Sequence, residues 1–168
     1  MPELPEVETT LKGIEPYIVG QKIIRLIVRQ GSLRWPVTPR MSTIIEQQTV
    51  IGVSRRAKYL IIQLGHGSIL VHLGMSGSLR IAETSMEWRK HDHIELQLAN
   101  GATLRYHDPR RFGCWLWSAE AHQQLQHLGP EPLTADFDGG RLWQLAKSRK
   151  VAVKPFIMDN KVVVGVGN

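Results

Sequence analysis

The clearest structural signal in this chain of 168 residues is Ile94-Glu95-Leu96-Gln97-Leu98-Ala99-Asn100-Gly101-Ala102-Thr103-Leu104-Arg105-Tyr106. Its first part alternates apolar and polar side chains, which is the period of a β-strand. Asn100-Gly101 is the kind of residue pair that a tight hairpin turn prefers, and Thr103 to Tyr106 then returns as a second strand. The segment therefore predicts an antiparallel hairpin.

Short apolar runs on both sides of this hairpin have the length and spacing of further strands. Gly, Ser or charged residues separate them. The predicted strands cover residues 22–29, 49–54, 59–64, 68–73, 78–81 and 112–117. With the hairpin they make about eight short strands joined by tight turns, so we predict a mainly β protein with added helices, built on an antiparallel β-sandwich or flattened barrel.

One amphipathic helix is predicted before the strands. Its apolar positions recur at three- and four-residue steps, at Leu4, Val7, Leu11 and Ile14. Pro5 is tolerated in the first turn of a helix, whereas Gly13 weakens the end. Such a helix would pack one face against the core and hold the amino terminus in a fixed position.

The pattern changes after Ser118, where helical segments replace strands. Helices are predicted over residues 119–128, 136–148 and 154–159. Gly129-Pro130-Glu131-Pro132 cannot continue a helix and has the composition of a linker. A second, helix-rich module therefore begins in this part of the chain.

Composition and charge restrict the class of protein. The net charge is +6 and the pI is about 9.8, and domains this basic favour polyanions such as nucleic acid. No run of about 18 apolar residues marks a membrane span, and the start lacks the basic and apolar segments of a secretory signal. A single cysteine, Cys114, allows no internal disulfide and suits a reducing cytosol.

The first residues offer a chemical reagent as well as a helix start. A small second residue generally lets Met1 be removed, which would leave a secondary amine at Pro2. A free α-amine has a pKa of about 7.7–8.0, so much of it is unprotonated near neutral pH and able to form an imine. Glu3 and Glu6 are candidate proton donors and orienting groups. The structural alternative is an ordinary helix start, in which Pro5 and the acidic residues favour the first turn.

Two loops and a basic segment carry candidate DNA-binding residues. Lys58 follows two arginines, and it is either part of a solvated basic loop or a phosphate clamp or proton carrier near Pro2. Met75 is expected at an exposed turn tip, and Arg110 with Phe112 offers a cation and a ring on another loop. If the two loops meet in space, these side chains could fill a hole left in a duplex.

Two histidines suggest a metal, but the pattern is poor for one. His91 and His93 would share one face of a strand, with Asp92 on the other. Zinc needs at least three protein ligands, so a phosphate contact by His91 is favoured over a metal site. Arg149, in a basic segment at the end of a predicted helix, could offset the helix dipole or bind phosphate.

Seven motifs in order along the chain are Met1-Pro2-Glu3-Leu4-Pro5-Glu6-Val7-Glu8-Thr9, Arg55-Arg56-Ala57-Lys58-Tyr59-Leu60, His72-Leu73-Gly74-Met75-Ser76-Gly77, Lys90-His91-Asp92-His93, Asp108-Pro109-Arg110-Arg111-Phe112-Gly113, Leu128-Gly129-Pro130-Glu131-Pro132-Leu133 and Lys154 to Asn168. Together they resemble bacterial formamidopyrimidine-DNA glycosylase, which excises oxidised purines from DNA. The resemblance covers the whole chain and is highly specific.

This resemblance implies a base-excision-repair glycosylase that is also a lyase, acting through a Schiff base on Pro2 and removing 8-oxoguanine and formamidopyrimidines. The implied catalytic residues are Pro2, Glu3, Glu6 and Lys58. The implied DNA contacts are His72, His91, Arg110, Arg149, Lys154 and Asn168. The implied void-filling residues are Met75, Arg110 and Phe112. The expected partner is double-stranded DNA with oxidised bases or abasic sites. The protein is expected to be a monomer in the bacterial cytoplasm, associated with the nucleoid.

The resemblance also implies a domain plan. It places a catalytic β-sandwich at residues 1–118, a helix and linker at 119–133, and the start of a helix–two-turn–helix module at 134–168. Family members continue further, through the rest of that module and a cysteine-bound zinc ribbon, so we expect a truncated chain that holds no zinc or other cofactor and has reduced DNA affinity and turnover. The alternatives are a noncatalytic nucleic-acid-binding fragment and an endonuclease VIII-type glycosylase for oxidised pyrimidines.

Overall fold

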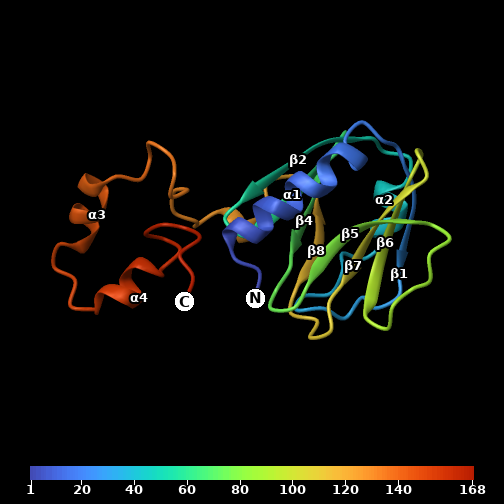
Figure 1. Ribbon diagram of the computed structural model, residues 1–168. Coiled ribbons are helices and arrows are strands. Elements are labelled where there is room, and N and C mark those ends of the chain that lie inside the picture. The colour runs from blue at the N-terminus through green and yellow to red at the C-terminus, as the bar shows by residue number, and fades with distance from the viewer. The chain divides into compact units, whose positions relative to one another are not determined.

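Two four-stranded antiparallel sheets form most of the first part of the chain in the computed structural model, which describes residues 1–168 (Figure 1). One sheet has the strand order β1-β6-β7-β5 and the other β2-β3-β4-β8. The strands are β1 Ile23–Val28, β2 Val50–Arg56, β3 Tyr59–Leu64, β4 Ser68–His72, β5 Ser78–Glu83, β6 Asp92–Leu98, β7 Ala102–His107 and β8 Cys114–Ser118. The predicted antiparallel sandwich is confirmed.

The predicted hairpin lies in the middle of the first sheet. β6 and β7 pair with Leu96 opposite Leu104, and Gly101 adopts a φ of 86° at the turn, a conformation that glycine tolerates best. The charged positions of this hairpin do not face water. Glu95 and Arg105 are both buried, and the Arg105 guanidinium donates to Glu95 Oε1 at 2.8 Å.

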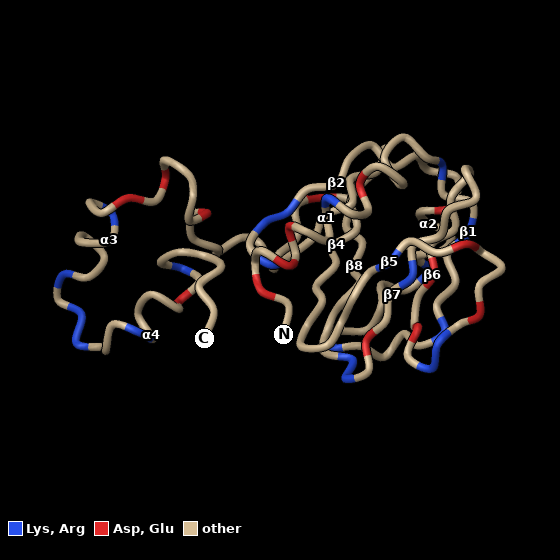
Figure 2. Tube along the Cα trace, in the orientation of Figure 1, with Lys and Arg blue, Asp and Glu red and all other residues tan.

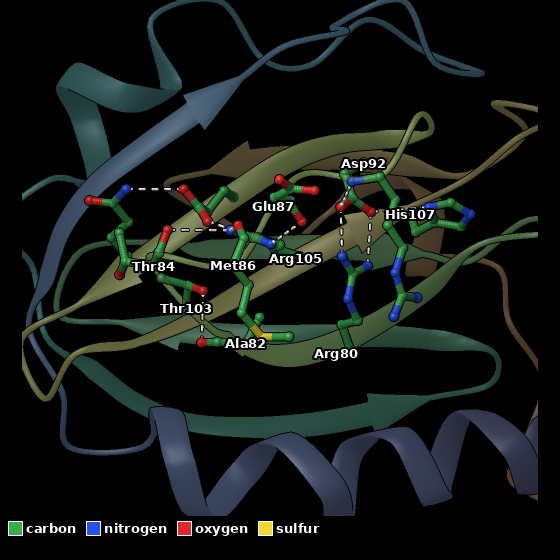
Figure 3. A network of polar contacts seen from close by, with 12 residues as sticks. Arg80, Ala82, Thr84, Met86, Glu87, Asp92, Thr103, Arg105 and His107 are labelled. Atoms are coloured by element: carbon green, nitrogen blue, oxygen red, sulfur yellow. Dashed lines mark hydrogen bonds and ion pairs between the residues drawn. The ribbon is translucent and has the colours of Figure 1, made fainter.

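The buried Arg105 also fastens the loop that joins β5 to β6. Its guanidinium donates to the backbone oxygens of Glu87 and Met86 at 3.0 Å and 2.5 Å. At the start of β6, the Asp92 carboxylate accepts hydrogen bonds from Arg80 Nη1 at 2.8 Å and from Arg80 Nη2 at 2.6 Å (Figure 3). A buried charge is costly unless it is paired and hydrogen-bonded, and these contacts meet that requirement.

The predicted amino-terminal helix is present as α1, Leu4–Ile18. Its predicted apolar stripe is buried at Val7, Leu11 and Ile14, and the helix packs against β2, β5 and β7. The helix continues past Gly13 to Ile18, which adds one more buried apolar contact. Pro16 lies inside the last turn, where it removes one backbone hydrogen bond, the one that an N–H at this position would donate to the Lys12 carbonyl.

A short helix between β1 and β2 was not predicted. This helix, α2, spans Met41–Ile45, and both of its end residues are buried in the sandwich core. The core contains apolar side chains from both sheets, from α1 and from α2. Packing against the core, rather than helical periodicity in the sequence, therefore explains why a helix as short as α2 forms.

Residues 121–168 form a second unit, separate from Met1–Glu120. It contains a single 3-10 turn, η1 Gln123–Leu125, and two helices, α3 Gly139–Ala146 and α4 Val153–Ile157. A small apolar cluster around Phe156, Val162 and Val163 holds this unit together. No helix in either unit is long and apolar enough to cross a membrane.

The helix predicted over residues 119–128 is wrong, since only η1 forms there. The segment has residues of good helix propensity, but only His122 is buried among residues 119–128. An isolated helix of this length is marginal without an apolar face to bury. The two later predicted helices are present in shortened form as α3 and α4.

Candidate active site and nucleic-acid interface

The amino end lies beside a cavity. Pro2 comes two residues before α1, and the cavity, of about 370 Å³, is lined by Pro2, Glu6 and Ser76 among others. The Glu3 backbone N–H donates to Glu6 Oε2 at 3.0 Å, which fixes the entry of the chain into the helix. Met1 also lines the cavity, so its removal would place the Pro2 amine at this opening.

Lys58 lies next to Glu3. The Lys58 Nζ atom is 2.6 Å from Glu3 Oε2, and the side chains are 18% and 33% exposed, respectively. Glu3 Oε2 is itself buried and accepts no hydrogen bond of good geometry, so the ammonium ion is the group that compensates its charge. All four residues implied as catalytic therefore lie in one region. Lys58 pairs with Glu3, the residue after Pro2, and Glu6 lines the same cavity as Pro2.

A tight turn presents Lys58. Arg56 and Tyr59 are paired across β2 and β3, so Ala57 and Lys58 are the two residues of the turn, and Ala57 has a φ of 53°. Arg55 Nη1 donates to the Ala57 carbonyl at 2.8 Å, and Arg55 Nε donates to Glu8 Oε2 at 2.6 Å. These contacts fasten the turn to α1, the same helix that follows Pro2.

The two predicted void-filling loops meet. Gly74 has a φ of 62°, and a Cβ atom there would lie 2.5 Å from the Phe112 carbonyl carbon, so the loops touch backbone to backbone. Met75 and Phe112 are 40% and 46% exposed, and the Arg110 guanidinium lies 4.8 Å from the Phe112 ring centroid. We call Met75, Arg110 and Phe112 the wedge. The two loops therefore meet in space, as filling a hole in a duplex requires.

A second cavity, of about 450 Å³, opens beside the wedge. Met75, Phe112, His72 and Arg34 line it. His72 Nδ1 accepts the Gly74 backbone N–H at 2.9 Å, which assigns the ring proton to Nε2.

The electrostatics of this cavity restrict what His72 can do. Burial, together with the positive charges of Arg34 and Lys58, lowers the pKa of His72 to about 4. At neutral pH His72 is consequently a neutral hydrogen-bond donor rather than a cation. Arg34 was not predicted as a site residue from the sequence, because it belongs to no motif. Only its position beside His72 in the structure identifies it.

His91 lies in a group of three imidazoles and does not form a metal site. Its ring centroid is 6.2 Å from that of His93 and 5.8 Å from that of His107. His93 Nε2 donates to the Asp108 carbonyl at 2.7 Å, and His107 Nδ1 contacts Asp92 Oδ1 at 3.0 Å. No group of three or more His, Cys, Asp or Glu side chains is placed to hold a metal ion.

Asp92 is a structural anchor rather than a ligand. Burial alone would raise the pKa of this carboxyl, but hydrogen bonds from Arg80, the Arg89 backbone and His107 bring the pKa well below its usual range. Asp92 therefore remains ionised, and its hydrogen bonds hold the start of β6, directly after His91, in place.

The remaining candidate residues lie in the second unit. Lys154 and Asn168 line one cavity of about 480 Å³ there. The Arg149 guanidinium lies 5.6 Å from the Phe156 ring centroid, within the basic segment between α3 and α4 that Figure 2 shows in blue. Lys147 Nζ lies 3.8 Å from the ring centroid of the exposed Trp143. This unit therefore presents its own cationic surface.

Comparison with known proteins identifies relatives of this chain. Residues 1–115 match the family described as the formamidopyrimidine-DNA glycosylase N-terminal domain. The chain is 56% identical over 170 aligned positions to the formamidopyrimidine-DNA glycosylase of Escherichia coli O7:K1 and likewise to that of Stutzerimonas stutzeri A1501, with all of this chain and 63% of each relative covered. It thus spans less than two thirds of the length of these relatives.

Solved structures give the same result for the fold. The Lactococcus lactis formamidopyrimidine-DNA glycosylase bound non-covalently to DNA with an AP site is 35% identical, with a TM-score of 0.88 over 99% of this chain and 65% of that one. The complex of the Lactococcus lactis enzyme with DNA containing FAPY-dG is 36% identical, with a TM-score of 0.87 over 99% of this chain and 64% of that one. Because the family match covers more than half of its residues, this chain belongs to the formamidopyrimidine-DNA glycosylase family.

Proposed function

We propose that this chain provides the nucleophile-bearing part of a DNA glycosylase and lyase that removes oxidised purines, such as 8-oxoguanine and formamidopyrimidines, from duplex DNA. The observation that carries the proposal is the Glu3–Lys58 contact of 2.6 Å beside Pro2. It places a cation and a carboxylate next to the one residue that could become a secondary amine. The relatives, which include a glycosylase in complex with DNA that contains FAPY-dG, support this choice of substrate.

The first step uses Pro2 after removal of Met1. The nitrogen lone pair attacks C1′ of the damaged nucleotide, the bond from C1′ to the base breaks, and the base leaves with a proton. The base takes the proton that the Pro2 nitrogen releases on bonding to C1′, and the Glu3 carboxylate relays a proton from the Lys58 ammonium to the sugar ring oxygen as the ring opens. Because proline is a secondary amine, the resulting iminium has no N–H to lose and stays positively charged.

Strand cleavage follows from that charge. The iminium acidifies the C2′ hydrogen, whose loss expels the 3′ phosphate. A second elimination expels the 5′ phosphate, and water then releases Pro2 and the sugar fragment. The product is a one-nucleotide gap. These steps need no dissolved cofactor, and we propose that none takes part.

DNA binding places the nucleotide for this attack. Flipping a nucleotide out of the stack costs a few kcal/mol, and least for a damaged base. The wedge would occupy the gap, with Met75 and Phe112 against the neighbouring bases. His91, Arg149, Lys154 and Asn168 are proposed backbone contacts, and His72 contributes as a neutral donor. We place this activity in the bacterial cytoplasm, at the nucleoid, in a monomeric protein.

Borohydride trapping on abasic-site DNA, followed by peptide mass mapping, tests the proposal. We expect one reduced adduct per chain, at Pro2, in protein that has lost Met1. The comparison protein is Pro2→Glu, whose large second side chain blocks methionine removal and moves the terminal amine by one residue, about 3.8 Å. An adduct at a lysine, or equal trapping by Pro2→Glu, would refute the assignment.

A second measurement tests the substrate class. Unlabelled duplexes that contain either 8-oxoguanine or thymine glycol compete for the trapping reaction. We expect the 8-oxoguanine duplex to compete better. A stronger effect of thymine glycol would instead support an endonuclease VIII-type specificity, and DNA binding without any adduct would support a noncatalytic fragment.

A further inference from the structure

One hydroxyl joins the two loops that carry the wedge. Ser76 Oγ donates to Asp108 Oδ1 at 2.7 Å and accepts the Arg110 backbone N–H at 3.0 Å. Ser76 directly follows Met75, so this single side chain connects the tip of one loop to the start of the other. It also lines the cavity that contains Pro2.

Asp108 is the fixed point to which Ser76 is attached. Its side chain is fully buried, and Oδ2 accepts from Tyr106 Oη at 2.6 Å and from the Gly113 backbone N–H at 3.0 Å. Burial and the neighbouring Asp108 raise the pKa of Tyr106, so the phenol stays protonated and able to donate. No lysine, arginine or histidine forms an ion pair with Asp108, which therefore depends on these hydrogen bonds for compensation.

The backbone around Asp108 leaves little room for movement. A Cβ atom at Gly113 would overlap the Tyr106 hydroxyl and the His72 carbonyl, and one at Gly74 would press on the Phe112 carbonyl group. The loops are thus closely packed where they meet, while Met75 and Phe112 remain partly exposed. A rigid base that presents exposed apolar tips is what insertion between bases requires.

We propose that Ser76 and Asp108 are positioning residues that hold the wedge as one body, so that Met75, Arg110 and Phe112 enter the duplex together. The inference rests on the proposed function, since it assigns a mechanical role within the same DNA interface. Neither residue touches the reacting atoms. The contribution of Ser76 lies in the two hydrogen bonds that couple the loops.

A fluorescent duplex tests this role. The probe contains a tetrahydrofuran abasic analogue, which cannot form an imine, with 2-aminopurine beside it to report unstacking. We expect Ser76→Ala to bind undamaged duplex as the unaltered chain does, but to shift the balance between filled and collapsed gap by at least about tenfold, because both hydrogen bonds that join the loops are lost. Ser76→Thr keeps the hydroxyl and should restore the signal, and Ser85→Ala, an exposed serine of the β5–β6 loop, is the matched control.

The result that would overturn the proposal is an equal fluorescence plateau for Ser76→Ala and the unaltered chain. If Ser76→Ala does not fold, amide hydrogen exchange in the unaltered chain decides instead. The Arg110 N–H belongs to an exposed residue, yet it should exchange slowly because Ser76 accepts it. Exchange at the rate of a free loop would refute the coupling. If the unaltered chain gives no fluorescence gain, the proposed DNA binding fails, and the exchange measurement still decides the role of Ser76.

Discussion

Acidification should remove a defined amount of stability through His72. Its pKa is lowered from 6.5 to about 4, first by burial and then by Arg34 and Lys58. The unfolded chain therefore takes up this proton near pH 6.5, and the folded chain only near pH 4. The contribution of neutral His72 to the free energy of unfolding is complete above pH 6.5 and is lost as the pH falls to 4. This difference in pKa corresponds to about 3 kcal/mol, and we expect about 2 kcal/mol because the ring is not fully buried.

Urea unfolding followed by tryptophan fluorescence, from about pH 7.5 to about pH 4.5, measures this loss. The matched variant is His72→Asn, whose side-chain oxygen can still accept the Gly74 N–H but does not titrate. Asp92 does not interfere, since its lowered pKa affects stability only as the pH falls below 3.8. The same pH dependence in both proteins, or an imidazole signal of His72 that titrates near pH 6.5, would refute the reasoning.

Three further outcomes are expected. Gly74→Ala should lower the free energy of unfolding by at least about 2 kcal/mol, since the residue has a φ of 62° and faces backbone atoms, and urea unfolding that matches the unaltered chain would contradict this. Arg105→Met should cost about 3–5 kcal/mol by leaving Glu95 buried without its partner, and the double variant with Glu95→Leu should recover part of that loss in the same assay. Arg34→Gln should raise the pKa of His72 in an NMR titration, and an unchanged pKa would exclude the charge effect.

Much of the fold follows from local sequence signals. The strand β3 coincides with the predicted residues 59–64, and the Asn100-Gly101 pair lies at the hairpin turn between β6 and β7. Such signals are short-range, because alternation and turn chemistry act over a few residues. The prediction failed where tertiary packing decides. Residues 119–128 have helical composition but bury no apolar face, and Met41–Ile45 is a helix because its ends fit into the core.

The sequence names candidate site residues but does not predict how they lie relative to one another. The motifs name Glu3 and Lys58, yet only the β2–β3 turn and the position of α1 bring the two side chains to 2.6 Å. The link between Ser76 and Asp108 has no local signature either, since it spans 32 positions and depends on how β4, β7 and β8 are placed. The neutral state of His72 requires the burial and nearby charges that only the folded chain supplies.

The position of Pro2, directly ahead of α1, also affects how this protein can be handled in the laboratory. Any affinity handle or reporter fused in front of it turns the ring nitrogen into a tertiary amide, which has no lone pair available for attack. α1 begins only at Leu4, so such a fusion should still fold and offer the wedge to DNA. Under the proposed function, chains tagged in that way would bind damaged sites without cutting the DNA, whereas preparations intended for turnover would carry their handle elsewhere.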